Sequence, residues 1–180
     1  MVDWKGQILE QLDFYWPLFR ARIDGLTDEE YFWEPVDGCW SMRPVPDGFA
    51  FDFTVPEPEP PPFTTIAWRL CHIAGPVFAW GASNHFGDGS YVMDNHGYPG
   101  TAAGALAYLD TQHALWRDHI GTLDEVGLAA PCGSAEGPYA ERPFAELILH
   151  LNREVIHHGA EVCLLRDLYR ASGGQLRVDG

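Results

Sequence analysis

Residues 147–165, LILHLNREVIHHGAEVCLL, carry the pattern that decides the fold. Apolar side chains recur there every three or four residues, which is the period of an amphipathic helix with one buried stripe. Pro143 suits the first turn of this helix, and Gly173-Gly174 should stop it after about Ala171. The pattern therefore predicts a long helix with His158 where an apolar residue is required. Its stripe consists of Leu147, Leu151, Val155, His158, Val162 and Leu165.

Three further segments show the helical period. The first runs from Trp4 to about Gly25 and contains Pro17, which should kink it. The second begins at Thr64 or Thr65 and ends near Asn84, and the third follows Thr101, a suitable N-cap. Four long helices predict an all-α, single-domain four-helix bundle over residues 1–180. The stripe of the second helix is predicted as Ile66, Leu70, Ile73, Val77 and Trp80.

The connections between these helices are expected to be irregular, with no strands. A Pro-rich loop covers about residues 34–62, and glycine-rich loops cover 87–100 and 127–142, with a tail at 172–180. Before the first loop, residues 27–30 match a capping box that opens a short helix. The long loop should pack as a lid or wall, because it contains aromatic side chains that a solvent-exposed linker would not need. They are Trp40, Phe49, Phe51 and Phe53.

Composition excludes several classes of function. The 180 residues include 26 acidic and 11 basic side chains, a formal net charge of −15, so we expect neither a nucleic-acid nor an anionic-membrane partner. No stretch approaches the roughly 18 apolar residues of a membrane span, and the N-terminus has no signal layout, so a cytoplasmic location is expected. The 4 cysteines form no C-x-x-C motif, which favours reduced thiols over a zinc knuckle or redox pair.

A carboxylate and an imidazole lie one turn apart on the last helix. Glu154 precedes His158 by four residues, which leaves the two only about 40° apart around the helix, both toward the bundle interior. A buried carboxylate needs a cation, and a metal ion also binds histidine. A third ligand should come from a facing helix, and His72 on the second helix is the best candidate. The alternative is that His72 and His158 are core histidines bonded to the backbone or to Glu154.

Several motifs resemble those of the DinB-like superfamily. Residues 149–161, LHLNREVIHHGAE, with 165–169, LRDLY, are similar to its last-helix signature. Residues 68–73, WRLCHI, resemble its second-helix motif, and residues 27–35, TDEEYFWEP, resemble the element after its first helix. The resemblance implies a four-helix bundle in up-down-down-up order. It also implies a divalent metal, bound here by His72, Glu154 and His158.

Glu154, the second of the three implied ligands in chain order, makes the resemblance more specific. Many members of the superfamily use three histidines, whereas Glu154 matches the metal-binding domain of mycothiol-dependent maleylpyruvate isomerase. That likeness implies an enzyme in which the metal activates a low-molecular-weight thiol, mycothiol or similar, for S-transfer or isomerisation on a small electrophile. Zinc is the first expectation for the metal, with nickel, iron or manganese as alternatives. The second domain of the isomerase is missing, and none of the cysteines needs to be the nucleophile.

Other residues receive weaker assignments. Arg69 and Arg153 could bind a carboxylate of the thiol cofactor or substrate, although a surface ion pair is the favoured role for each. Asn152 and Glu161 could orient the ligands. His113 and His119 are expected to be structural or exposed, and surplus Trp and Phe on helix faces could support a homodimer.

Two rival hypotheses remain open. One is a non-catalytic metal-binding stress-response bundle in which the ion staples the helices, with His150 or His157 as a fourth ligand. The other is a bundle whose pocket binds a small apolar ligand without metal. Separately, Trp40, Trp68 and Trp80 could wall a pocket, although tryptophans in a bundle more often serve simple packing.

Overall fold

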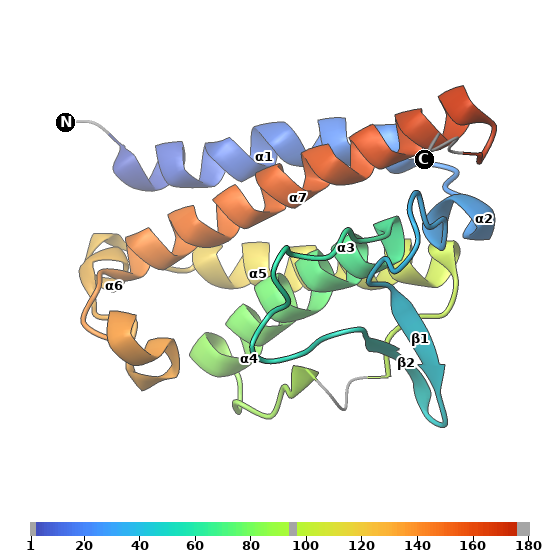
Figure 1. The fold of residues 1–180 in the computed structure, drawn as a ribbon. Coiled ribbons are helices and arrows are strands. Elements are labelled where there is room, and N and C mark those ends of the chain that lie inside the picture. The colour runs from blue at the N-terminus through green and yellow to red at the C-terminus, as the bar shows by residue number, and fades with distance from the viewer. Residues whose placement is uncertain (1–2, 94–96, 176–180) are drawn as a thin grey trace.

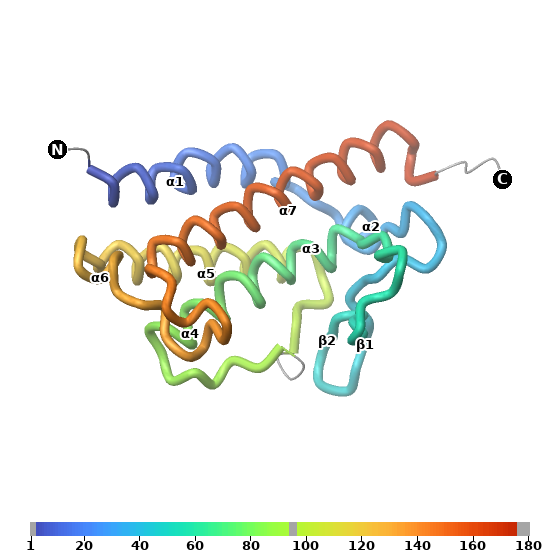
Figure 2. The backbone as a smooth tube through the Cα atoms, turned by 60° about the vertical axis from the view of Figure 1, so that its left-hand side comes forward, coloured from blue at the N-terminus to red at the C-terminus, as the bar shows by residue number. Residues whose placement is uncertain are grey.

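The computed structural model describes residues 3–93 and 97–175, and its long helices form two layers (Figure 1). Helices α1 (Trp4–Ile23) and α7 (Phe144–Ser172) lie side by side in one layer. The other layer pairs α5 (Ala102–Gly121) with a composite second helix. The turned view in Figure 2 shows the same two pairs. Since α1 and α7 run one way and the other two run back, the up-down-down-up order is confirmed.

Local signals in the sequence set the helix ends. The Thr101 hydroxyl accepts a hydrogen bond from the Gly104 amide and caps α5, as predicted. Helix α7 begins directly after Pro143 and ends at Gly173, whose φ of 61° is the left-handed conformation that glycine adopts without strain. Every residue of the predicted α7 stripe is buried, His158 included. In the described part of the chain, no helix combines the length and apolar character that crossing a membrane requires.

The second helix is a composite of α3 (Ile66–His72), the π-helical segment η1 (Ile73–Ala79) and α4 (Trp80–Phe86). Pro76 lies in η1 and has no N–H to donate to the carbonyl four residues earlier, which is that of His72. The wider register is instead seen where the Trp80 amide bonds the Gly75 carbonyl, five residues back. The chain therefore changes from α to π winding directly after His72.

This change of winding makes one stripe prediction wrong. Ile66, Leu70, Ile73 and Val77 are buried as expected, but Trp80 is only half-buried. A π turn takes more residues than an α turn, so positions after it rotate away from the extrapolated stripe. Small residues of α4 turn inward instead, namely Ala82 and Gly81.

The 34–62 segment is not wholly irregular, which corrects the prediction of no strands. It contains a hairpin of β1 (Met42–Val45) and β2 (Gly48–Phe51), in which Met42 pairs with Phe51 and Val45 with Gly48. Prolines obscured it in the sequence, yet a two-stranded sheet consists of edge strands, where proline is tolerated. The predicted wall is present in part, because Phe51 packs edge-to-face on Trp68 at 5.5 Å between ring centroids, whereas Phe53 is 48% exposed.

The 127–142 loop also contains more order than expected. Helix α6 (Glu125–Ala129) starts just before it, capped by the Asp124 carboxylate at 2.8 Å from the Gly127 amide. The 3-10 segment η3 (Ser134–Tyr139) follows and packs near α4 through an ion pair between His85 and Glu136. Of the predicted tail 172–180, residues 176–180 lie outside the described residues.

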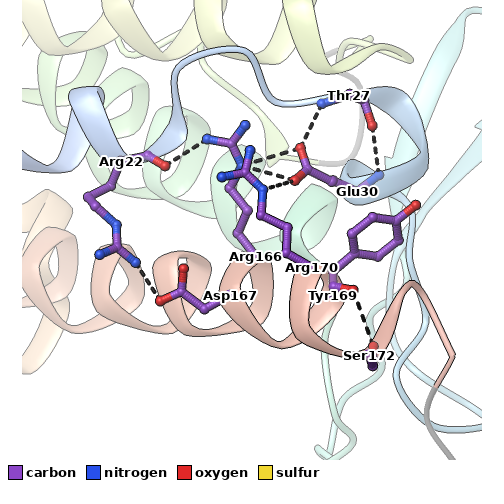
Figure 3. Close-up of polar contacts among 8 residues, drawn as sticks. All are labelled: Arg22, Thr27, Glu30, Arg166, Asp167, Tyr169, Arg170 and Ser172. Atoms are coloured by element: carbon purple, nitrogen blue, oxygen red, sulfur yellow. Dashed lines mark hydrogen bonds and ion pairs between the residues drawn. The ribbon is translucent and has the colours of Figure 1, made fainter.

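A buried ion cluster joins the ends of three helices (Figure 3). The capping box predicted for α2 (Asp28–Tyr31) is present, with the Glu30 carboxylate 3.0 Å from the Thr27 amide. The same carboxylate accepts bonds from Arg166 at 3.1 Å and Arg170 at 2.8 Å, both on α7. Arg166 also donates to the Arg22 carbonyl near the end of α1. Glu30 thus joins α2 to α7, and Arg166 joins α7 to α1, at one end of the bundle.

Candidate metal centre

Three side chains of two facing helices converge in the middle of the bundle. His72 is the last residue of α3, and Glu154 and His158 lie one turn apart on α7. Their ligand atoms all lie within 4.8 Å of one another. The structure thus brings together the same three residues that the sequence singled out.

The His158 ring lies between two carboxylates. Its Nε2 is 3.3 Å from Glu154 Oε2, and its Nδ1 is 2.7 Å from Glu161 Oε2. If Nδ1 carries the proton, it donates to Glu161 and leaves the Nε2 lone pair directed at Glu154. A lone pair facing a carboxylate is an arrangement that a cation between them would stabilise. An imidazolium ring with a proton on each nitrogen would also satisfy this geometry, without a metal.

Arg69 on α3 completes the far side of this group. Its Nη1 lies 3.0 Å from His158 Nδ1, and its Nε lies 3.1 Å from Glu161 Oε2, although that N–H is not aligned for a hydrogen bond. A guanidinium only donates, so it cannot bond Nδ1 while Nδ1 itself donates to Glu161. We therefore regard the Arg69–Glu161 ion pair as its main contact. Burial lowers the pKa of Arg69, and the charges of Glu161 and Glu57 oppose that shift.

His72 is held as a neutral imidazole. Burial, followed by the nearby His158 and Arg69, lowers its pKa to about 3. Its ring stacks on Trp68 with centroids 5.1 Å apart and meets His158 edge-on at 4.8 Å. A neutral imidazole keeps the lone pair that a metal requires, so burial prepares His72 as a ligand at neutral pH.

A second group of potential ligands lies on the other side of His158. His157, His158 and Glu161 also converge within 4.8 Å. His157, however, is an exposed side chain, and the Arg69 guanidinium occupies the space beside His158 Nδ1. Because a fixed positive charge there repels another cation, the group containing His72 is the better candidate.

The remaining predicted site residues lie around this centre. His150 and Arg153 are on the outer face of α7, with nitrogens 3.7 Å and 3.9 Å from Glu154 Oε1. Asn152 does not orient the ligands, because its amide donates to the Ile8 carbonyl and ties α7 to α1. Glu161 does contact a candidate ligand, as expected. Of the predicted aromatic wall, Trp40 and Trp68 stack on each other, whereas Trp80 contacts His85 elsewhere.

Among the described residues, His113, His119 and the cysteines play no part in this cluster. His113 stacks on Trp16 at 3.6 Å, and burial lowers its pKa to about 4. His119 stacks on Phe86. The cysteines are free, and burial raises the pKa of Cys71 to about 12, so this neighbour of His72 is a core thiol and not a nucleophile.

Sequence reasoning missed a hollow of about 540 Å³ beside the centre. It lies between α7 and the segment that contains η3, and His150 and Arg153 belong to its lining. Its other residues, such as Cys132 and Arg142, come from an irregular segment without periodicity. Arg142 directly precedes Pro143 at the start of α7, but no signal in the sequence could have placed Cys132 against this helix.

Comparison with known proteins gives one match. The family model described as the DinB superfamily matches residues 11–162, which include all three converging side chains. No curated protein and no solved structure matches the chain significantly.

Proposed function

Because the chain belongs to the DinB superfamily, we propose that His72, Glu154 and His158 bind one divalent metal ion that activates a low-molecular-weight thiol. The thiol, of the mycothiol class, would react with a small electrophile by S-transfer or isomerisation. The proposal rests on one observation, the convergence of two imidazoles and a carboxylate from α3 and α7 within 4.8 Å. Membership of the superfamily supports the metal-binding part.

The donor set fits a borderline divalent ion. Two imidazole nitrogens and one carboxylate oxygen suit zinc first, and also nickel, iron or manganese. Three protein donors leave positions for water or a thiol, as in catalytic zinc sites. The nearby His150 belongs to neither convergent group found in the described residues, so it gives the structural-ion hypothesis little support.

The residues around the ligands have separate tasks in this proposal. A divalent cation in the centre supplies the charge that lowers the pKa of a coordinated thiol. Glu161 holds the His158 ring in the tautomer that exposes Nε2. Trp68 covers one face of His72 and keeps water from that side.

The chemistry balances without a protein nucleophile. The thiol gives its proton to a solvent base, and its sulfur bonds to the electrophilic carbon while the bond to the leaving group breaks. In isomerisation, the sulfur adds to a conjugated double bond, rotation occurs about the new single bond, and the sulfur departs. The thiol is then regenerated.

Metal analysis tests the first part of the proposal. Protein stripped with a chelator and reloaded should bind one zinc ion per chain, and His72→Ala, Glu154→Gln and His158→Ala should each weaken binding at least about tenfold. His119→Ala is the matched control, since that ring stacks on Phe86 outside the cluster. Stoichiometric zinc in wild type and Glu154→Gln alike, or none in wild type, would contradict the proposed site.

Turnover tests the second part. The loaded protein should accelerate the reaction of mycothiol, bacillithiol, glutathione or cysteine with 1-chloro-2,4-dinitrobenzene above the metal-free control. If zinc raises the melting temperature while no thiol reacts faster, the ion is a structural staple and the enzymatic proposal is wrong.

A further inference from the structure

The hollow beside the candidate metal centre has an unusual charge environment. Arg142 and Arg153 both belong to its lining, together with apolar surface from Cys132 and Leu147, and Arg153 Nη2 lies 2.5 Å from His150 Nδ1. Both guanidinium groups are open to solvent, with 61% and 70% of the side chain exposed. A chain of net charge −15 would be expected to pair its few basic residues closely.

The other described arginines follow that expectation. Each lies within 3.1 Å of a carboxylate oxygen: Arg20, Arg22, Arg43, Arg69, Arg117, Arg166 and Arg170. Among the described ion pairs, Arg142 approaches a carboxylate only at 3.6 Å and Arg153 only at 3.9 Å. The two loosely paired arginines are thus the two that line this hollow.

Neither of the two acidic side chains in the lining, Glu136 and Glu146, pairs closely with Arg142 or Arg153. Glu136 is instead hydrogen-bonded to His85 at 2.8 Å. Glu146 is the loose partner of Arg142, one turn away on an exposed surface, where an ion pair contributes little. Arg153 has Glu154 as its loose partner, and Glu154 is a proposed metal ligand.

We propose that this hollow binds the carboxylate of a small acidic molecule, held by Arg142 and Arg153, with the apolar body of the molecule against Cys132 and Leu147. Guanidinium forks match carboxylates in geometry and charge. The inference deepens the proposed function and rests on it for the reacting partner. Two residues of the lining, His150 and Arg153, lie 3.7 Å and 3.9 Å from Glu154 Oε1, and they connect the hollow to the proposed centre. The substrate or thiol cosubstrate is accordingly a carboxylic acid.

Binding can be tested on metal-free protein, which separates it from the proposed function. The probe is glutarate, with the uncharged 1,5-pentanediol as its matched control, followed by NMR of arginine Nε–H groups and of amides in residues 132–153. Glutarate should bind saturably and pentanediol should not. Arg142→Gln/Arg153→Gln should weaken glutarate binding at least about tenfold, the loss expected for charge-assisted hydrogen bonds.

Two further variants control for general charge effects. Arg117→Gln removes the same charge from a distant ion pair with Asp13, and its glutarate affinity should stay within about twofold of wild type. Glu146→Gln removes the competing carboxylate and should strengthen binding. Melting temperatures verify that each variant is folded.

The outcomes are distinct. Equal glutarate affinity in wild type and the double variant, no saturable binding, or tighter binding of inorganic phosphate than of glutarate would each overturn the inference. Glutarate binding lost in the double variant, in a protein that fails to bind zinc, would uphold the anion site and reject the metal-dependent function.

Discussion

At the scale of single residues, Glu161 contacts two members of the candidate site, His158 and Arg69. It is not a predicted ligand, yet its carboxylate lies 2.7 Å from His158 Nδ1 and 3.1 Å from Arg69 Nε. It therefore fixes which imidazole nitrogen faces Glu154. It also balances the positive charge of Arg69, the arginine of α3 that lies beside the candidate ligands.

Replacing Glu161 should therefore affect metal binding more than folding. Glu161→Ala is expected to weaken zinc affinity by about 10- to 100-fold, measured by competition with a chromophoric chelator, because His158 loses the group that orients it. Asp110→Ala is the control, since Asp110 pairs with Arg20 away from the site. A zinc affinity within about twofold of wild type would show that Glu161 does not orient the ligand.

At the scale of elements, the sequence predicted where the long helices lie but not how the second one winds. Its apolar period held as far as Val77, and then the π segment changed the register. Pro76 alone does not reveal this, because a proline can also kink or end a helix. The hairpin was missed for a related reason: short edge strands with prolines have little periodicity.

The π segment also packs unusually closely, which gives a test by substitution. A Cβ at Gly75 would lie 2.6 Å from Tyr91 Oη and 2.8 Å from Tyr98 Cε1. Gly75→Ala should therefore lower the free energy of unfolding by about 1–3 kcal/mol, measured by urea denaturation. Gly121→Ala is the control, because its nearest neighbour is the flexible end of Arg117 and alanine favours helix. Equal stability of Gly75→Ala and wild type would mean that the tyrosines move aside freely.

At the scale of the whole molecule, the Glu30 cluster couples helices far apart in the chain (Figure 3). Glu30→Gln should lower the free energy of unfolding by about 3–5 kcal/mol, because it leaves Arg166 buried without its counter-charge. Asp167→Asn removes the exposed partner of Arg22 instead and should cost less than about 1 kcal/mol. Similar decreases in the free energy of unfolding of the two variants would show that the buried ion pairs stabilise the fold no more than the exposed one.

The same cluster predicts the response to acid. Burial alone would raise the pKa of Glu30, but the bonds from Arg166, Thr27 and Arg170 outweigh it and hold the pKa below the ordinary 4.5. A lowered carboxyl pKa contributes stability above that ordinary value and loses it as the pH falls further. Wild type should therefore lose stability below about pH 4.5 more steeply than Glu30→Gln in the same denaturation series.

The sequence determined the two parts of the site that depend on helix geometry. Glu154 and His158 are related by one turn, so their common direction follows from the sequence. His72 required the facing helix, which the bundle prediction supplied. Cys132 reaches α7 only through the folding of an irregular segment, and Arg166 bonds Glu30 across 136 residues. Such contacts depend on tertiary packing, which no local pattern encodes.

The stacking of Trp68 on His72 has a practical consequence. The indole lies 5.1 Å from the imidazole and faces the Arg69 guanidinium, 5.4 Å from its ring centroid. Indole emission responds to the charge of groups stacked on it, so any gain or loss of positive charge at His72 alters the light that Trp68 emits. Trp68 would therefore report the binding of a metal ion at the proposed centre in solution, without an added dye.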